Sequence, residues 1–208
     1  MNEYGQTQDR IISAALDLFL EFGIKKTSLE DVAARCGLTR ATVYRYYRDK
    51  RELVRASFMH MVDIVGNALN DLDKHSQYTT RKSAEYIRQA VASLPKGDLP
   101  SRLNELKILY TDIFEEYQHG RLGIIKRVYG KLTSLARSED LLAEDGIDYE
   151  VFQTVIAESI IFITQHPLVL SKGTAFKDIY NFILDLWVYG ILGIKERNRK
   201  AKKAKNRS

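Results

Sequence analysis

Residues 27–50 read TSLEDVAARCGLTRATVYRYYRDK, and the fold is decided there. Ser28 can cap a short helix that Gly37 then ends, because a serine hydroxyl accepts a hydrogen bond from the first helical turn and glycine adopts the left-handed conformation that closes a helix. Thr39 can cap a second helix over residues 40–48. Two short helices joined by a tight turn with a glycine predict a helix-turn-helix.

The second of these helices has one face for the core and one for a partner. Val43 and Tyr47 are four residues apart and should face the small core. The side chains that then point outward are Arg40, Ala41, Tyr44, Arg45 and Arg48. Such a face suits a DNA major groove, because a guanidinium can form two hydrogen bonds to guanine and a tyrosine hydroxyl can reach a phosphate.

Further helices are predicted on both sides of this pair. Residues 9–23 place apolar side chains at helical spacing and end in a glycine. After the pair, Asp49 can cap a helix whose apolar stripe runs on to Leu72. Residues 1–52 therefore predict a three-helix DNA-binding domain, and the helix that follows Asp49 would join it to the rest of the chain.

The run of residues 10–53 resembles the N-terminal DNA-binding domain of the TetR family of bacterial transcriptional regulators. The likeness rests on the ending LFLEFG of the first helix, on the core TSLEDVAARCGLTRATVYRYYRDK and on the pair Glu52 and Leu53. It covers about a quarter of the chain. A pattern of this length is far more specific than an isolated motif.

The resemblance implies DNA contacts at the positions that match the family's pattern. It implies that Thr39, Arg40, Ala41 and Arg45 lie against base edges or nearby backbone, that Thr42, Tyr44, Tyr46 and Lys50 touch phosphates, and that Ser28 caps its helix beside the DNA. Packing of Tyr46 on the edge of the domain remains an alternative for that residue. The family varies most at Arg40, Ala41 and Arg45, so the operator sequence does not follow from the resemblance.

Basic charge is confined to two short blocks, although the net charge is only +5. Residues 25–55 carry a net charge of +5 and residues 195–208 one of +7, whereas residues 56–194 carry −4. A basic block attached to an acidic body is typical of a phosphate-binding module joined to a domain that does not bind nucleic acid. We interpret the C-terminal block as a solvated, disordered segment or a frayed helix end.

The rest of the chain predicts only helices, because no alternating strand pattern of useful length occurs. The expected helices cover about 81–94, 101–117, 122–136, 149–166 and 176–199, with breaks at PKGDLP, at Gly120 and at Pro167. The fold class is therefore all-α. Residues 53–199 should form a larger helical ligand-binding and dimerisation domain, and residues 200–208 a basic tail.

The last two expected helices are apolar around more than one face, so they predict an interface beyond the chain's own core. The resemblance implies a homodimer in which these helices form a four-helix bundle with the twofold mate. The candidate dimer residues are Phe152, Ile156, Ile160, Ile163, Ile183, Trp187 and Gly190. A simple crossing of helices within one chain is the alternative for the small residue Gly190.

Aromatic residues in the middle helices are the candidates for an inducer pocket, which the resemblance implies in the body. They are Tyr86, Tyr110, Phe114, Tyr117 and Tyr129. Three of them, Tyr110, Phe114 and Tyr117, form a stripe at helical spacing, and such a stripe is also the signature of ordinary core packing. A largely apolar or aromatic small molecule is the expectation from composition.

No catalytic, metal or cofactor site is predicted. The sequence has no glycine-rich phosphate loop, nucleophile elbow or HExxH motif, and its one Cys and four His lack zinc-ligand spacing. Cys36 lies on the apolar face of its helix, which favours a small core residue over a redox sensor. The polar start and the lack of a long apolar stretch predict a cytoplasmic protein without membrane contact.

Together these features predict a dimeric repressor that binds a pseudo-palindromic DNA operator and is released by a small-molecule inducer. Three alternatives stay open. The chain could be a DNA-binding dimer that senses no ligand, a transcriptional activator, or a helical enzyme that has kept a vestigial DNA-binding head.

Overall fold

The computed structural model describes residues 3–74, 77–95 and 97–139, with single residues and short runs between 141 and 186. Its helices are α1 (Glu3–Phe22), α2 (Leu29–Cys36), α3 (Arg40–Tyr46), α4 (Lys50–Asp73), α5 (Thr80–Ala92), α6 (Leu99–Leu109) and α7 (Thr111–Ser138). No strand occurs among the described residues, and the predicted all-α class is confirmed. No helix in this described part combines the length and apolar character needed to cross a bilayer.

The predicted helix caps are present in the N-terminal part. The Ser28 hydroxyl accepts a hydrogen bond from the Asp31 N–H at 3.1 Å, and the Asp31 carboxylate accepts one from the Ser28 N–H at 2.7 Å. Hydrogen bonds from the Ser28 hydroxyl and N–H hold the pKa of Asp31 below its ordinary value. Gly37 ends α2 with a φ of 64°, and the side chains of Thr39 and Asp49 cap α3 and α4. Local hydrogen bonds therefore fix the helix-turn-helix.

A first apolar core lies under α1, α2, α3 and the start of α4. Val43 and Tyr47 are buried in it, as predicted from their spacing. Cys36 is buried there too, and burial raises the pKa of its thiol, which confirms a core residue. The same core includes Leu106 of α6 and Tyr117 of α7. The predicted DNA-binding part, residues 1–52 (the head), therefore shares an apolar core with the helices that follow it (the body) instead of having a separate core.

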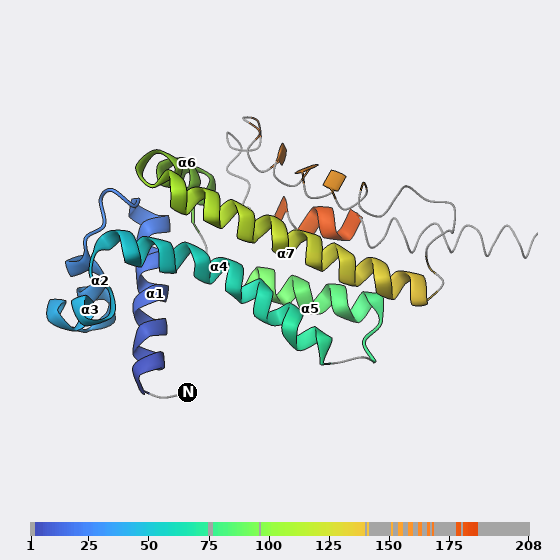
Figure 1. The fold of residues 1–208 in the computed structure, drawn as a ribbon, viewed down its shortest axis with the longest axis horizontal. Coiled ribbons are helices and arrows are strands. Elements are labelled where there is room, and N and C mark those ends of the chain that lie inside the picture. The colour runs from blue at the N-terminus through green and yellow to red at the C-terminus, as the bar shows by residue number, and fades with distance from the viewer. Residues whose placement is uncertain are drawn as a thin grey trace, which may run out of the picture.

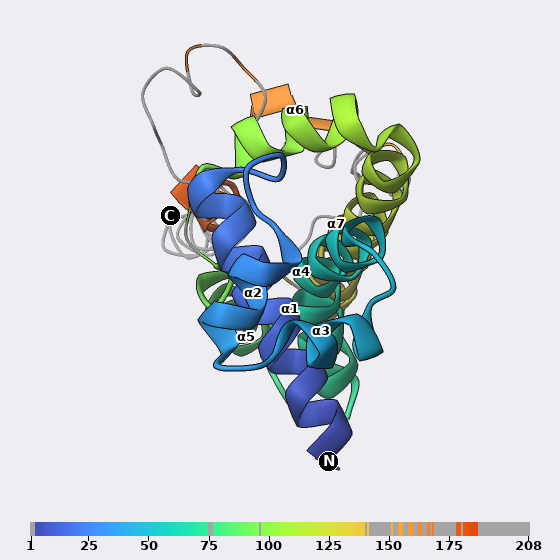
Figure 2. The same ribbon diagram turned by 90° about the vertical axis from the view of Figure 1, so that its left-hand side faces the viewer.

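The body is built on α4 and α7, which run side by side along the length of the molecule, with α5 packed against both (Figure 1). Figure 2 looks from the head and shows α6 between the end of α1 and the start of α7. A second core lies between α4, α5 and α7 and includes Leu69, Ile87 and Tyr129. Ile183, from the described helical residues 181–186, joins this core.

The expected break at Gly120 is wrong. The chain breaks at Tyr110, where φ is −146° and ψ is 70°, and α7 then continues through Gly120 and Gly123. A glycine inside a helix costs only about 1 kcal/mol relative to alanine, so packing can override it. A Cβ at Gly120 would stand 3.2 Å from Cγ1 of Val62 and 3.4 Å from Cε of Met59. Because Gly120 has no side chain, α7 can pack closely against α4 at this position.

The two glycines of α7 should respond differently to alanine. Among the described residues, no atom beyond the neighbouring backbone of α7 lies within 4 Å of a Cβ at Gly123. Gly123→Ala should therefore raise the free energy of unfolding by about 0.5–1 kcal/mol through helix propensity. Gly120→Ala should raise the free energy of unfolding by less than Gly123→Ala does, or lower it, because Val62 must move to make room for the new methyl group. Urea unfolding of both variants measures the difference, and equal gains would contradict the close packing.

Candidate nucleic-acid interface

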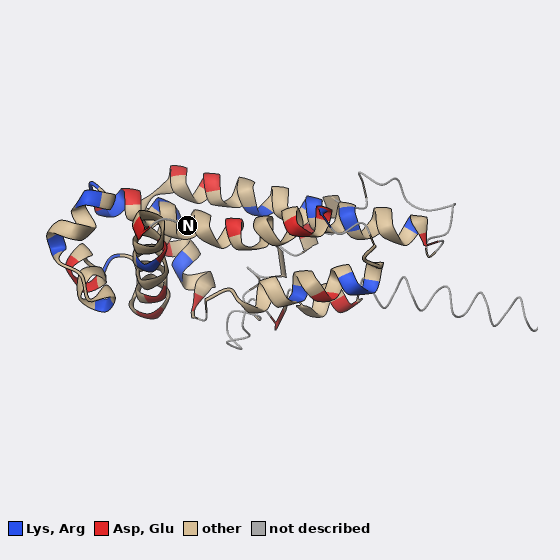
Figure 3. Ribbon diagram, turned by 90° about the horizontal axis from the view of Figure 1, so that it is seen from below, with Lys and Arg blue, Asp and Glu red and all other residues tan. Residues whose placement is uncertain are grey.

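The predicted DNA-reading face of α3 is open to solvent. Thr39, Arg40, Ala41 and Arg45 are exposed, and Tyr44 is 39% exposed. The buried side of the same helix is formed by Val43, so the two faces predicted from the sequence are separated as expected. The basic block of residues 25–55 lies in α2, α3, the start of α4 and the turns between them. Figure 3 shows several Lys and Arg residues at this end of the molecule, with acidic residues between them.

Arg40 is held in place by two neighbours. Its Nη1 lies 2.6 Å from Oε1 of Glu30 in α2, and its Nη2 donates a hydrogen bond to the Tyr44 hydroxyl at 3.3 Å. The guanidinium also lies 5.1 Å from the centre of the Tyr44 ring. The hydrogen bond to Tyr44 and the charge of Glu30 raise the pKa of Arg40 above its ordinary value. Glu30 therefore orients this guanidinium and competes with any anion that approaches it.

Tyr46 is half-buried at the C-terminal end of α3. Its ring stacks on Tyr4 of α1, with the ring centres 4.4 Å apart, and the Arg45 guanidinium lies 5.6 Å from the Tyr46 ring centre. These contacts support the alternative interpretation of Tyr46, which is packing on the edge of the domain. The contact with Tyr4 is not predicted from the sequence, because the expected first helix begins at residue 9 whereas α1 begins at Glu3.

The remaining candidate DNA residues lie near the turns. The hydroxyls of Thr39 and Thr42 are 2.8 Å apart. Ser28 is half-buried in its cap, and Lys50 donates from Nζ to the carbonyl of Lys25 at 3.2 Å. Burial lowers the pKa of Lys50. Lys50 therefore ties the start of α4 to the turn between α1 and α2.

A carboxylate of the body binds that same turn. Glu105 of α6 accepts hydrogen bonds from the N–H of Ile24 at 2.9 Å and from the N–H of Lys25 at 2.7 Å. Arg102, one helical turn away, lies 3.1 Å from the Glu105 carboxylate. Burial alone would raise the pKa of Glu105, but the two backbone N–H groups and Arg102 outweigh it and lower this pKa. No sequence pattern marks this contact, because the partners lie 80 and 81 residues apart.

The start of α7 is attached to the start of α4 by two ion pairs. Arg55 forms a two-pronged contact with Glu116, with N···O distances of 2.7 and 2.5 Å. Arg51 pairs with Asp112, and its guanidinium lies 5.4 Å from the ring centre of Tyr110. These contacts bring the junction of α6 and α7 close to the helix that leaves the head.

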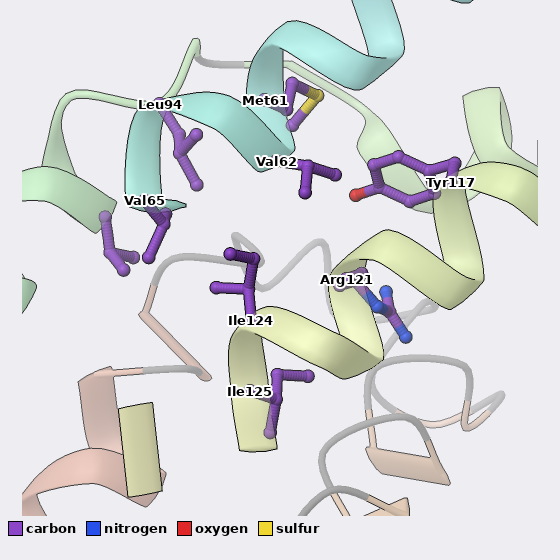
Figure 4. A pocket seen from close by; sticks show the side chains of 9 residues that line it. Met61, Val62, Val65, Leu94, Tyr117, Arg121, Ile124 and Ile125 are labelled. Atoms are coloured by element: carbon purple, nitrogen blue, oxygen red, sulfur yellow. The ribbon is translucent and has the colours of Figure 1, made fainter. Parts of the chain in front are cut away.

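The aromatic candidates for a ligand site are not brought together. Tyr117 alone among them lines the cavity of about 40 Å³ between α4, α5 and α7 (Figure 4). Tyr110 and Phe114 pack against the first core, Tyr86 packs against the second core beside Tyr78, and Tyr129 is fully buried. Arg121 also lines this cavity. Its place there is not predicted from the sequence, because a lone arginine in a helix is usually a surface residue.

The dimer candidates are placed only in part. Ile183 is 6% exposed and lies in the chain's own core, and Ile163 packs against that core. Phe152, Ile156, Ile160, Trp187 and Gly190 lie outside the described residues. The large apolar side chains that are exposed in this region include Val151, Val155, Phe162, Phe182 and Leu186.

A family model matches the N-terminal part of the chain, and the relatives found are HTH-type transcriptional regulators. The profile of bacterial regulatory proteins of the tetR family matches residues 11–57. An uncharacterised HTH-type transcriptional regulator of Mycobacterium tuberculosis is 25% identical over 166 residues, covering 77% of this chain and 82% of that protein. The HTH-type transcriptional regulator TtgR of Pseudomonas putida is 39% identical over 54 residues, 26% of each chain.

Solved structures of the same fold cover almost the whole chain. A TetR transcriptional regulator from Legionella pneumophila superposes with a TM-score of 0.57 at 16% identity, over 95% of this chain and 97% of that one. The TetR-like regulator LfrR of Mycobacterium smegmatis, solved in complex with proflavine, gives 0.56 at 18% identity, over 91% and 98%. At these identities the likeness shows the fold.

Glu105→Gln should weaken the junction between head and body. Since the folded pKa of Glu105 is lowered, its charge stabilises the fold above the ordinary value of 4.5, and this contribution is lost as the pH falls through the folded pKa. At pH 7 the variant should lose about 1–3 kcal/mol of unfolding free energy.

The difference between wild type and Glu105→Gln should shrink below about pH 4.5, as followed by urea unfolding across pH. Glu115→Gln removes the same charge from an exposed position of α7 and serves as the control. An equal loss in both variants would mean that net charge, not the contact with Ile24 and Lys25, sets the effect.

Proposed function

We propose that this chain, a member of the TetR family of bacterial transcriptional regulators, represses transcription by binding a pseudo-palindromic operator as a dimer, and that a small molecule releases it. The observation that carries the proposal is the exposed face of α3, where Arg40, Tyr44 and Arg45 stand clear of the core. In this proposal residues 1–52 are the DNA-binding unit, and residues 53–199 sense the ligand and dimerise. The regulator would act in the cytoplasm without catalysing a reaction.

Base reading is assigned to the guanidinium groups of α3. Arg40 and Arg45 can each bind guanine through two hydrogen bonds in the major groove, with Thr39 and Ala41 at the same surface. Thr42, Tyr44, Tyr46 and Lys50 are assigned to phosphates, and Ser28 to the cap beside the DNA. In a dimer the two copies of α3 would enter successive major grooves, about 34 Å apart.

Dimerisation is assigned to the C-terminal region. Val151 and Val155 are four residues apart and exposed, as are Phe182 and Leu186. Side chains at this spacing share one helical face, and exposed apolar faces of this kind are typical of helix–helix interfaces between subunits. A second copy of the chain is therefore the proposed partner of both faces.

Release by a ligand is supported by where the cavity lies. Its walls come from α4, which enters the head, and from α7, whose start is tied to α4 by ion pairs. A ligand that favoured another packing of α4 and α7 would change the placement of the heads, and operator DNA would weaken ligand binding by the same factor. LfrR, a regulator of this fold, has been solved with proflavine bound.

Activation is the second candidate function. A chain of the same fold, the dihydroxyacetone kinase operon activator DhaS, superposes with a TM-score of 0.58 at 16% identity. The same binding geometry can either occlude a promoter or support transcription from it. A transcription assay on the bound site separates the two.

Loss of the α3 side chains should abolish specific DNA binding. Against a site selected from random-sequence DNA, Arg40→Ala should bind about tenfold or more weakly and with relaxed base preference. Tyr44→Ala should weaken all sequences alike. Fluorescence anisotropy across a salt series measures both effects. If all sequences bind alike, and removal of residues 195–208 abolishes binding, the basic tail is the nucleic-acid contact and the proposal fails.

Glu30→Gln should strengthen DNA binding about two- to fivefold, because it removes the carboxylate that competes for Arg40 and repels phosphate. Glu21→Gln is the matched control, since Glu21 also forms an exposed ion pair within the head, with Arg35 at 3.4 Å. Anisotropy titrations at one salt concentration compare the variants. Weaker binding by Glu30→Gln alone would show instead that Glu30 holds Arg40 in its binding orientation.

A further inference from the structure

The first turns of α1 reach the helix that is proposed to read DNA. α1 begins at Glu3, ahead of the pattern of residues 9–23 that predicts it, and its buried residues begin only at Ile11. Tyr4 is 53% exposed, yet its ring stacks on the ring of Tyr46 in α3, with the ring centres 4.4 Å apart and the ring planes 28° from parallel. This contact joins a turn of α1 that lies outside the first core to the end of α3.

The same tyrosine ring holds a guanidinium of the DNA-reading face. The Cζ atom of Arg45 lies over the Tyr46 ring, 5.6 Å from the ring centre. A guanidinium is attracted to the face of an aromatic ring, and this attraction restricts a side chain that otherwise rotates about several bonds. Because Tyr4 stacks on Tyr46, the three side chains form one continuous group, which we call the Tyr4–Tyr46–Arg45 stack.

Arg40, the other arginine that is proposed to read bases, is held in a different way. Its Nη1 lies 2.6 Å from Glu30, and its Nη2 donates to the Tyr44 hydroxyl at 3.3 Å. Both partners occupy N–H groups that a base would also bind. Within the described part of the chain, the side chain of Arg45 takes part in no ion pair or hydrogen bond. The stack therefore orients Arg45 while its N–H groups stay available to a base.

A guanidinium that is held in place discriminates between bases better than one that rotates freely. Two parallel hydrogen bonds to guanine require the guanidinium to align with the edge of the base, because a hydrogen bond weakens as its angle departs from linear. A side chain that already lies near one orientation also loses less conformational entropy when it binds. The stack should therefore favour the correct base at the position of Arg45 without adding a contact to DNA.

We propose that Tyr4 is a positioning residue for base recognition, which acts through Tyr46 to hold Arg45 in the orientation that reads guanine. This inference rests on the proposed function, because it requires α3 to lie in a major groove. It gives the first turns of α1 a part in the choice of operator. Only the ring of Tyr46 is used, so its hydroxyl stays available for the phosphate contact proposed above.

Base preference at single positions of the DNA tests this role. The full chain is titrated by anisotropy with a site selected from random-sequence DNA and with all single-base variants of that site, and Arg45→Ala identifies the positions that depend on Arg45. At these positions Tyr4→Ala should lose about two- to fivefold of the discrimination between bases, which is what an exposed contact between a cation and a ring can supply. Discrimination at the positions that depend on Arg40 should stay the same.

Further variants separate positioning from other roles of Tyr4. Tyr4→Phe keeps the ring and should discriminate like wild type, and Tyr4→Ala should have no further effect at the same positions once Arg45 is alanine. Phe22→Ala is the control, because it removes a ring that is 48% exposed at the other end of α1. Unchanged discrimination by Tyr4→Ala, or loss of discrimination by Tyr4→Phe, refutes the role. Equal weakening of all sequences by Tyr4→Ala also refutes it, since Tyr4 would then contact the phosphate backbone.

The stack is also tested in the protein without DNA. Protons over the face of an aromatic ring are shifted upfield in an NMR spectrum, so the side-chain protons of Arg45 should resonate upfield of those of Arg48, whose side chain is 89% exposed. Tyr4→Ala should reduce this shift, and an unshifted Arg45 in wild type refutes the stack. A reduced shift with unchanged base preference overturns the positioning role and leaves the repressor proposal standing. A wild-type protein that prefers no DNA sequence ends both.

Discussion

The close packing of α4 against α7 is the contact on which the rest of the structure depends. Gly66 of α4 lies against Ile124, and Gly120 of α7 lies against Val62, so each helix approaches the other where it has no side chain of its own. The first half of α4 lies in one apolar core and its second half in the other. Because α7 also supplies buried side chains to both cores, a change in the packing of these two helices reaches the head and the body together.

The polar contacts between α4 and α7 determine how the two helices are aligned, and they contribute little to the free energy of folding. The pairs Arg51 with Asp112 and Arg55 with Glu116 are largely exposed, and exposed ion pairs contribute little to folding. They do fix which turn of α4 lies beside which turn of α7, since each pair joins one arginine of α4 to one carboxylate of α7 at hydrogen-bond distance. Apolar burial supplies the stability, and these pairs supply the register.

The sequence predicted features that are fixed by neighbours along the chain, and missed those fixed by distant ones. The caps of α2, α3 and α4 each act over three residues, so residue type and spacing identify them. Glu105 meets Ile24 across 81 residues, and Gly120 resembles a helix break unless the contact with Val62 is known. Ile183 shows the same limit, because a helix that is apolar on all sides does not reveal which side faces its own core.

The helix-turn-helix is attached to two different parts of the body. At one end, the turn before α2 is held by Glu105 of α6, and at the other end α3 is followed directly by α4. Tyr110 joins α6 to α7 and lies under Arg51 of α4. A ligand that separates α4 from α7 would therefore shift α6 relative to α4. Under the proposed function, two attachments that moved by different amounts would rotate α3 against the DNA. A helix that reads bases in a groove would tolerate such a rotation poorly, because its hydrogen bonds to the bases depend on direction.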